Sequence, residues 1–193
     1  DTLANQIMQC NMSPNIIRIY SEEIEQKEFP ILNNHVTGSS LSSAVMVDIA
    51  LHHKIRKSTN QFSDSIQEQD MLLQLYPDDI GKDQIDEYKA TIKKAEMSEI
   101  IEADIILCTC VTSARQQLRQ NTNVQQIIID DCNLCTEPES MTPIILNLNL
   151  QQVTLLGDSQ GLKPLVHNKA ARLLGLQTSL MEPYVDKTVD LKI

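Results

Sequence analysis

Glycine is scarce in this sequence: the 193 residues contain five, scattered at positions 38, 81, 157, 161 and 175. A glycine-rich phosphate-binding loop needs glycines close together, followed by Lys and Ser or Thr, because its backbone N–H groups must approach the phosphate oxygens. No segment of the sequence has this pattern. The chain therefore offers no candidate cradle for a triphosphate.

Long apolar runs are also lacking. None approaches the roughly 20 residues that a membrane-spanning helix needs, and no charged-then-apolar leader opens the sequence. The five cysteines are odd in number, and their spacing does not match a small disulfide scaffold. We therefore expect a soluble intracellular protein of the cytoplasm or nucleus, with reduced thiols and no membrane partner.

Basic residues are outnumbered, with 16 Lys and Arg against 26 Asp and Glu, which gives a net charge of −10. This balance argues against a domain that binds DNA or RNA by bulk electrostatic attraction. Small cationic lanes remain possible where basic residues cluster, although ordinary solvated surface charge is the favoured reading of either cluster taken alone. The two clusters are Lys54, Arg56 and Lys57, and Lys163, Lys169 and Arg172.

Four short apolar runs, rich in Ile, Leu and Val, are typical of strands covered on both faces of a parallel sheet. They span 15–20, 104–110, 124–130 and 152–157. Helical patterns lie between them, including 63–75, 81–103, 137–146 and 169–174, and a long loop is expected over 28–43. The turn Tyr76-Pro77-Asp78-Asp79 joins the first two helices into a hairpin over 58–103. The length suits one α/β domain.

Two strand ends carry acidic side chains. Ile127, Ile128 and Ile129, predicted to be buried, lead directly to Asp130 and Asp131. A nucleotide hydrolase needs a carboxylate that orients Mg²⁺, usually through water, and a second that positions the attacking water. The same layout recurs in the run Leu155-Leu156-Gly157-Asp158, and ligands bind at the carboxyl ends of strands in open parallel sheets.

The order of these motifs resembles superfamily 1 ATP-dependent helicases of the nonsense-mediated-decay type. The resemblance rests on 104–110, 127–131, 136–139, 157–164 and 174–180 taken together, and it extends to 18–30 and 51–56. It implies an incomplete RecA-like doubly wound parallel sheet of the P-loop NTPase type, formed by 1–57 and 104–193. The hairpin at 58–103 then corresponds to a helical insertion in the first motor domain.

The resemblance also implies roles for individual residues. Asp130 matches the magnesium-orienting carboxylate of the Walker B motif, and Asp131 stands at the general base. Gly157, Asp158 and Gly161 fall in the third helicase motif, which couples nucleotide state to strand movement. The segment that lies along the nucleic-acid track in relatives corresponds here to Thr109, Cys110, Thr112 and Ser113.

Three positions depart from the family pattern. Asp131 replaces a glutamate, Gly161 replaces a glutamine near the γ-phosphate, and Pro183 stands where relatives usually have arginine. The aspartate side chain is one methylene shorter than glutamate, so the carboxylate of the general base is displaced from the attacking water. General-base catalysis tolerates little displacement of this kind. A weakened or inactive motor and a fully active one are both compatible with these changes.

As the resemblance has it, this chain is a fragment of an ATP-dependent helicase. The phosphate loop lies upstream of the position matching Asp1, and a second motor domain lies beyond Ile193. The parent is then expected to use ATP and Mg²⁺ and to bind single-stranded RNA or DNA, whereas the fragment alone is predicted to be inactive. Because the expected sheet is incomplete, its unpaired strand edges predict poor stability in isolation.

Two other readings stay open. A degenerate, non-catalytic interaction module, such as a transcriptional coactivator uses, would contact nuclear-receptor or other protein partners. A Cys₄ zinc site would use Cys108, Cys110, Cys132 and Cys135, although a position inside an apolar strand disfavours the first two. The histidines at 35, 52, 53 and 167 show no triad-like pattern. His52 and His53 are expected to point to different helix faces.

Overall fold

The computed structural model describes residues 2–9, 14–31, 46–120, 123–158 and 160–187. Most of the loop predicted over 28–43, together with Cys10, His35 and Gly38, lies outside these ranges. The chain divides into two compact units, Asp1–Thr112 and Ser113–Ile193. Each unit is considered by itself.

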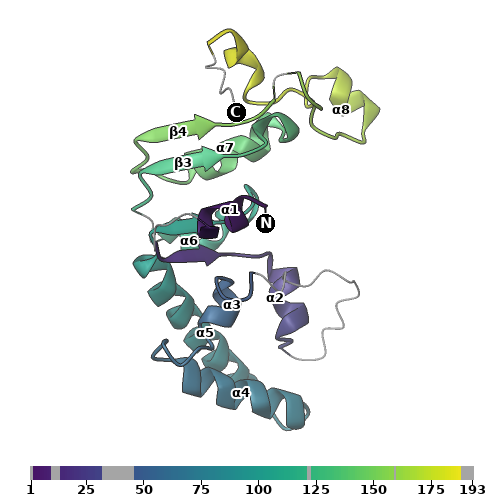
Figure 1. Cartoon of the computed structure of the whole chain (residues 1–193). Coiled ribbons are helices and arrows are strands. Elements are labelled where there is room, and N and C mark those ends of the chain that lie inside the picture. The colour runs from purple at the N-terminus through teal and green to yellow at the C-terminus, as the bar shows by residue number, and fades with distance from the viewer. Residues whose placement is uncertain (1, 10–13, 32–45, 121–122, 159, 188–193) are drawn as a thin grey trace. The chain divides into compact units, whose positions relative to one another are not determined.

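The first unit is built on a parallel strand pair. Strand β1 (Ile16–Arg18) pairs with β2 (Ile105–Leu107), with Ile16 opposite Ile105 and Arg18 opposite Leu107. Helix α1 (Thr2–Gln9) precedes β1, and the described part of the long crossover to β2 contains four more helices (Figure 1). These are α2 (Glu22–Glu28), α3 (Leu51–Lys54), α4 (Ser63–Leu75) and α5 (Lys82–Glu102).

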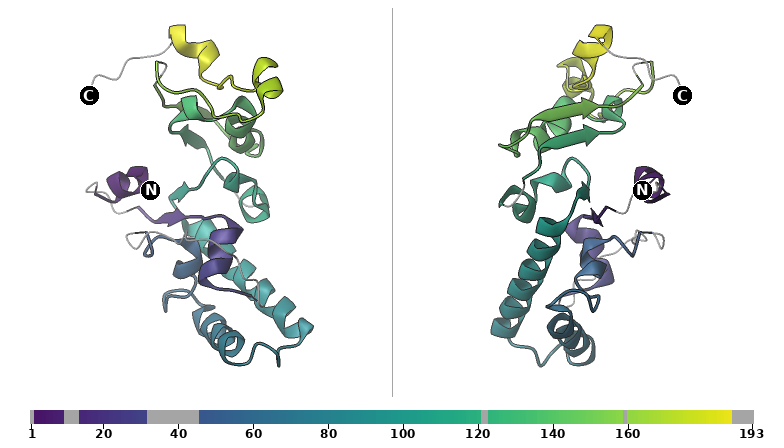
Figure 2. Two further views of the ribbon diagram at one scale, coloured as in Figure 1. Left: turned by 90° about the vertical axis from the view of Figure 1, so that its right-hand side faces the viewer. Right: turned by 60° about the vertical axis from the view of Figure 1, so that its left-hand side comes forward.

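Helices α4 and α5 form the predicted helical hairpin. Helix α4 has the expected bounds, and α5 is one residue shorter at each end than the predicted 81–103. The two helices lie side by side in both views of Figure 2. Helix α4 ends at Leu75, with Tyr76 as its C-cap, because the ring of the next residue, Pro77, disfavours helical geometry at Tyr76.

A buried polar network attaches the hairpin to the rest of the unit. The Arg56 guanidinium donates from Nε to Asp70 Oδ2 at 2.6 Å and from Nη2 to Asp70 Oδ1 at 3.1 Å, and Tyr88 Oη also donates to Asp70. On α5, Glu99 accepts from Asn60 Nδ2 at 2.8 Å and pairs with Lys54 Nζ at 3.2 Å. Every buried charge named here has an opposite charge or a hydrogen-bond donor beside it, as burial of ionic groups requires.

The second unit contains the other parallel pair. Strand β3 (Gln126–Ile129) pairs with β4 (Gln152–Leu155) in the register that sets Ile129 opposite Leu155. Helix α6 (Gln116–Gln120) precedes β3, and α7 (Glu137–Ile145) connects the strands and packs against β3 (Figure 1). Helix α8 (Lys169–Leu173) follows, and short 3₁₀ turns occupy Thr112–Ala114, Cys132–Leu134 and Glu182–Lys187.

Two details of the predicted strands are wrong. Ile129 is buried, but Ile127 is only half-buried and Ile128 is 62% exposed. Successive side chains of a strand point to opposite faces, and α7 packs against β3, so alternate residues of this pair remain open to solvent. All four strands are also shorter than predicted, and Cys108 and Cys110 follow β2 rather than lying within it.

The fold class is α/β, with parallel strand pairs connected through helices. Among the residues that the structure describes, no helix is both long and apolar enough to cross a membrane.

Candidate functional site

The predicted acidic residues lie at one end of the β3–β4 pair. Asp130 follows directly on β3, and Asp158 follows β4 by three residues. The pairing continues past both strand ends, because Leu156 N–H donates to Ile129 O at 2.9 Å and Cys132 N–H donates to Leu156 O at 2.8 Å. The two loops therefore leave the same edge of a parallel pair, as predicted for these carboxylates.

The backbone at Asp131 has an uncommon conformation, with φ 52° and ψ 36°. Few residues other than glycine adopt this left-handed geometry, and aspartate is among those that do so more readily. Its N–H donates to Asp130 Oδ1 at 3.1 Å, and both carboxylates are exposed. The turn thus presents two adjacent carboxylates to solvent at the end of the strand.

Asn133 joins the two loops. Its Oδ1 accepts a hydrogen bond from Asp158 N–H at 3.1 Å, and its Nδ2 donates to Leu162 O at 2.9 Å. One side chain therefore ties the turn after β3 to the loop after β4. Nothing in the sequence singled Asn133 out, and the only local signal is an amide residue three positions beyond the strand-end acid.

Gly157 lies against Asn133 of the turn that follows β3. A Cβ atom there would meet Asn133 Oδ1 at 2.6 Å, Met181 Sδ at 3.0 Å and the Asn133 backbone nitrogen at 3.1 Å. Real Cβ atoms essentially never show a contact as short as the 2.6 Å one with Asn133 Oδ1. The position of Asp158 against Asn133 thus depends on glycine at 157.

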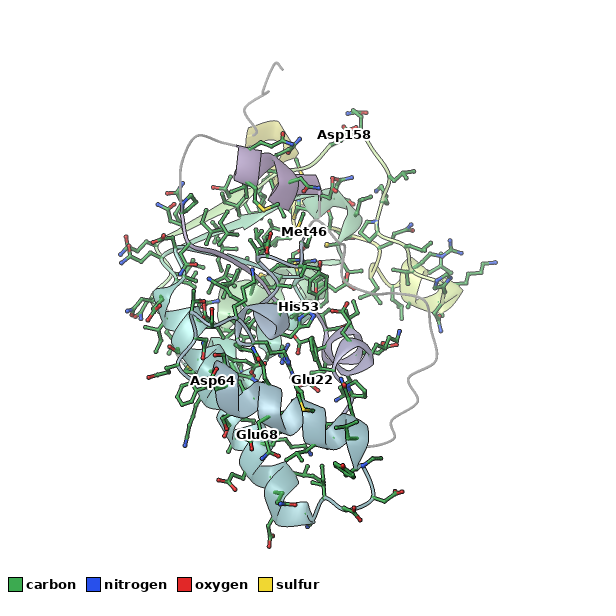
Figure 3. The ribbon with its side chains drawn as sticks, turned by 60° about the horizontal axis from the view of Figure 1, so that its bottom comes forward. Glu22, Met46, His53, Asp64, Glu68 and Asp158 are labelled. Atoms are coloured by element: carbon green, nitrogen blue, oxygen red, sulfur yellow. The ribbon has the colours of Figure 1, made fainter. Side chains whose placement is uncertain are left out.

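The loop after β4 turns back on itself at Asp158 (Figure 3). Asp158 Oδ1 accepts from Gln160 N–H at 2.9 Å, and Asp158 O accepts from Gly161 N–H at 3.1 Å. A Cβ atom at Gly161 would lie 3.1 Å from both Cβ and Oδ2 of Asp158. Any side chain at 161, including the glutamine of the family pattern, requires this turn to open slightly.

The segment predicted to contact nucleic acid is a hydrogen-bonded turn. Thr109 Oγ1 accepts from Thr112 N–H at 3.1 Å and lies 2.8 Å from Thr112 Oγ1. Thr112 and Ser113 are buried, with 7% and 9% of their surface accessible to solvent, whereas Cys110 is half-buried and Thr109 is exposed. Thr109 is therefore the most accessible of the four predicted contact residues.

The cysteines behave as packing residues. Burial raises the pKa of the Cys108 thiol, and Cys132 lies in the core of its unit with Sγ 3.8 Å from Ser140 Oγ. Zinc thiolates must be deprotonated, so a raised pKa opposes metal binding at Cys108. These surroundings count against the Cys₄ zinc reading.

The expectation for the paired histidines is wrong. His52 and His53 do not point to different faces: their ring centroids are 4.5 Å apart, and both Nε2 atoms approach Glu28 Oε2. The short helix α3 places both rings toward α2, where Glu28 is the last helical residue. Burial, opposed by the Glu28 carboxylate, lowers the pKa of His52 to about 4.

Known proteins resemble this chain over most of its length. Human "3'-5' exoribonuclease HELZ2" is 32% identical over 191 residues, covering 95% of this chain and 6% of the relative. The Arabidopsis thaliana "Regulator of nonsense transcripts 1 homolog" is 30% identical over 183 residues, covering 93% of this chain and 14% of the relative. Saccharomyces cerevisiae "ATP-dependent helicase NAM7" is 32% identical over 109 residues, covering 52% of this chain and 11% of the relative. The chain thus spans a small part of each relative.

The family described as "AAA domain" matches residues 1–169, which include both strand pairs and the strand-end acids Asp130 and Asp158. The predicted resemblance to helicases of the nonsense-mediated-decay type is confirmed by the relatives named Regulator of nonsense transcripts 1. The chain belongs to the AAA domain family.

Proposed function

We propose that this chain is part of the first motor domain of an ATP-dependent RNA or DNA helicase. The observation that carries the proposal is the parallel pairing of β3 with β4, which brings the loops of Asp130 and Asp158 to one edge. Carboxylates at the carboxyl end of neighbouring parallel strands suit a magnesium–nucleotide site. The relatives named as ATP-dependent helicases support the same assignment.

The proposed roles follow from this geometry. Asp130 orients Mg²⁺ through water, and its exposed carboxylate beside a second one suits a hard cation that keeps part of its water shell. Asp131 positions the attacking water with a side chain one methylene shorter than glutamate. Asp158, held by Asn133 at the neighbouring loop, relays nucleotide state. When bound, ATP would supply the γ-phosphoryl group, and Mg²⁺ would neutralise the charge that develops on it.

The finer fold is proposed on the same grounds. Both strand pairs are parallel, with helices in the connections, as in a doubly wound RecA-like sheet formed by 1–57 and 104–193. The α4–α5 hairpin is the insertion at 58–103. Thr109 and its turn then lie along the track of the nucleic acid strand, and a second motor domain of the same polypeptide supplies the remaining nucleotide contacts.

The test is nucleic-acid-stimulated ATPase activity in the complete polypeptide that contains these residues. Asp130→Asn is expected to abolish turnover, and Asp131→Asn to lower kcat by about 10²-fold or more, since general bases contribute about 10²–10⁴-fold. Asp131→Glu restores the family base and is expected to raise kcat. Asp64→Asn, an exposed acid on α4, is the matched control and should leave kcat unchanged.

The same assay separates this proposal from an interaction module without catalysis. The tight Gly161–Asp158 turn favours the module, because it leaves no room for the family glutamine without rearrangement. If the unmodified protein and Asp131→Glu are both silent although nucleotide binds, the motor assignment fails and the module remains. Loss of turnover in Asp130→Asn with activity retained in Asp64→Asn excludes the module as the sole function.

A further inference from the structure

Three side chains of the types that bind metals converge in the first unit, and none of them belongs to the proposed nucleotide site. Glu28 ends α2, and His52 and His53 lie in α3 (Figure 3 labels His53). The Nε2 atoms of His52 and His53 are 2.9 Å and 2.5 Å from the same oxygen, Glu28 Oε2. All three ligand atoms lie within 4.8 Å of one another. We propose that Glu28, His52 and His53 form a zinc-binding site that joins α2 to α3.

The chemistry of the donor set selects the metal. Two imidazole nitrogens and one carboxylate oxygen are a ligand set that zinc uses, and a water completes the fourth position in sites with three protein ligands. Ca²⁺ and Mg²⁺ prefer oxygen ligands throughout and are disfavoured here. His53 keeps 23% side-chain exposure, so the fourth position has access to solvent.

Burial prepares the ligands for the metal. The side chains of Glu28 and His52 are only 10% and 4% exposed, so their positions are set by the packing around them before any metal binds. Without a metal, one carboxylate oxygen serves both rings. The buried His52 Nδ1 has no hydrogen-bond partner among the described residues, and a metal bound at Nε2 does not supply one. A metal satisfies both Nε2 lone pairs and the carboxylate at once.

Only small movements separate the present geometry from a coordinated one. Tetrahedral zinc at about 2.0–2.1 Å from each ligand sets neighbouring ligand atoms about 3.3 Å apart. The Glu28 oxygen must therefore separate from each ring nitrogen by several tenths of an ångström. The unpartnered His52 Nδ1 lacks the second-shell acceptor usual for zinc-bound histidine, so we expect an affinity about 10–100-fold below that of a fully supported site.

The surrounding charges are compatible with a cation. Arg56 is the neighbouring positive group, but Asp70 neutralises it through two hydrogen bonds. Its guanidinium carbon also lies 3.6 Å from the centroid of Phe29, whose ring contacts both histidines at centroid distances of 5.2 Å and 6.0 Å. The cation is thus bordered by a paired guanidinium and an aromatic ring.

The site is tested by titrating Zn²⁺ into the full 193-residue chain after removal of metals with a chelator and exchange into chelator-free buffer. We expect one Zn²⁺ per chain and a rise in melting temperature. Glu28→Gln and His53→Asn should each weaken binding at least 10-fold. The matched controls are Glu22→Gln, an exposed acid on α2, and His167→Asn in the second unit, and both should bind as the unmodified chain does.

Cobalt distinguishes this site from the thiols, because its visible and near-ultraviolet absorption differs between nitrogen–oxygen and thiolate ligation. A nitrogen–oxygen spectrum that disappears in His53→Asn supports the proposal. A thiolate spectrum, absence of stoichiometric binding, or equal affinity in His53→Asn and the controls overturns it. Circular dichroism establishes that His53→Asn is folded, and Glu28→Gln, which preserves side-chain size, provides the second reading.

Discussion

Replacing Gly157 with alanine is expected to destabilise the second unit by about 2–4 kcal/mol. The added Cβ would lie 2.6 Å from Asn133 Oδ1, so the Asn133 amide must move, and 3.1 Å from the Asn133 backbone nitrogen, which must also shift by a few tenths of an ångström. Overpacking of this kind costs about 1–3 kcal/mol. Displacing Asn133 Oδ1 also breaks its hydrogen bond from Asp158 N–H, which contributes about 1 kcal/mol.

The assay is urea unfolding followed by circular dichroism. Gly81→Ala is the matched control, because a Cβ there meets its nearest neighbour, Gln84 Oε1, at 4.0 Å. Its expected cost is below about 1 kcal/mol, the price of alanine at a helix N-cap. A double-mutant cycle with Asn133→Ala adds a second criterion: Gly157→Ala should cost less in that background, since one clashing partner is gone. Equal costs for Gly157→Ala and Gly81→Ala, or no coupling to Asn133, would refute the reasoning.

Three further predictions concern titration, charge burial and thiol reactivity. The pKa of His52 is about 4 in the folded protein, below its ordinary 6.5, so its contribution to the free energy of unfolding is complete above pH 6.5 and is lost as the pH falls toward 4. Urea unfolding with chelator present should show about 2 kcal/mol less stability from this group at pH 5 than at pH 7. An unchanged pH profile in His52→Asn would contradict this prediction. Asp70→Asn leaves Arg56 unpaired in a largely buried position and should cost about 3 kcal/mol, whereas Asp64→Asn on the same helix should stay within about 0.5 kcal/mol by the same measurement. Because burial raises its pKa, Cys108 should react with iodoacetamide at pH 7.5 more slowly than cysteine in a reference peptide, as followed by mass spectrometry of the peptides; equal rates would argue against that environment.

Local signals explain why several of the helices were predictable. Asn168 precedes α8, asparagine is a residue that often caps helices, and its Oδ1 accepts from Ala171 N–H at 3.0 Å. Gly175 follows the end of that helix, where glycine is common, and its φ of +95° is one that glycine adopts readily. The α4–α5 hairpin followed equally from helical periodicity and a Pro-containing turn. Each of these signals acts within a few residues, so no tertiary information was needed.

Burial was harder to predict, because it depends on what covers each face. The run Ile127-Ile128-Ile129 indicated a strand buried on both faces, yet only Ile129 is buried. An apolar run specifies a preference for burial, whereas the packing partner decides which side chains obtain it. The predicted instability of the isolated chain concerns the same open faces and edges, and a sharp cooperative melt at high temperature would contradict it.

The site divides along the same line. Sequence order was enough to locate Asp130 and Asp158 at strand ends, because an apolar run followed by an acid is a local pattern. Only the tertiary structure brings Asn133 between their loops or makes Gly157 sterically necessary, since both depend on the β3–β4 register. The Glu28–His52 contact joins residues 24 positions apart and left no local signal at all. Local conformational preferences depend on neighbouring residues and can therefore be predicted from the sequence. Contacts between distant segments form only when folding brings those segments together.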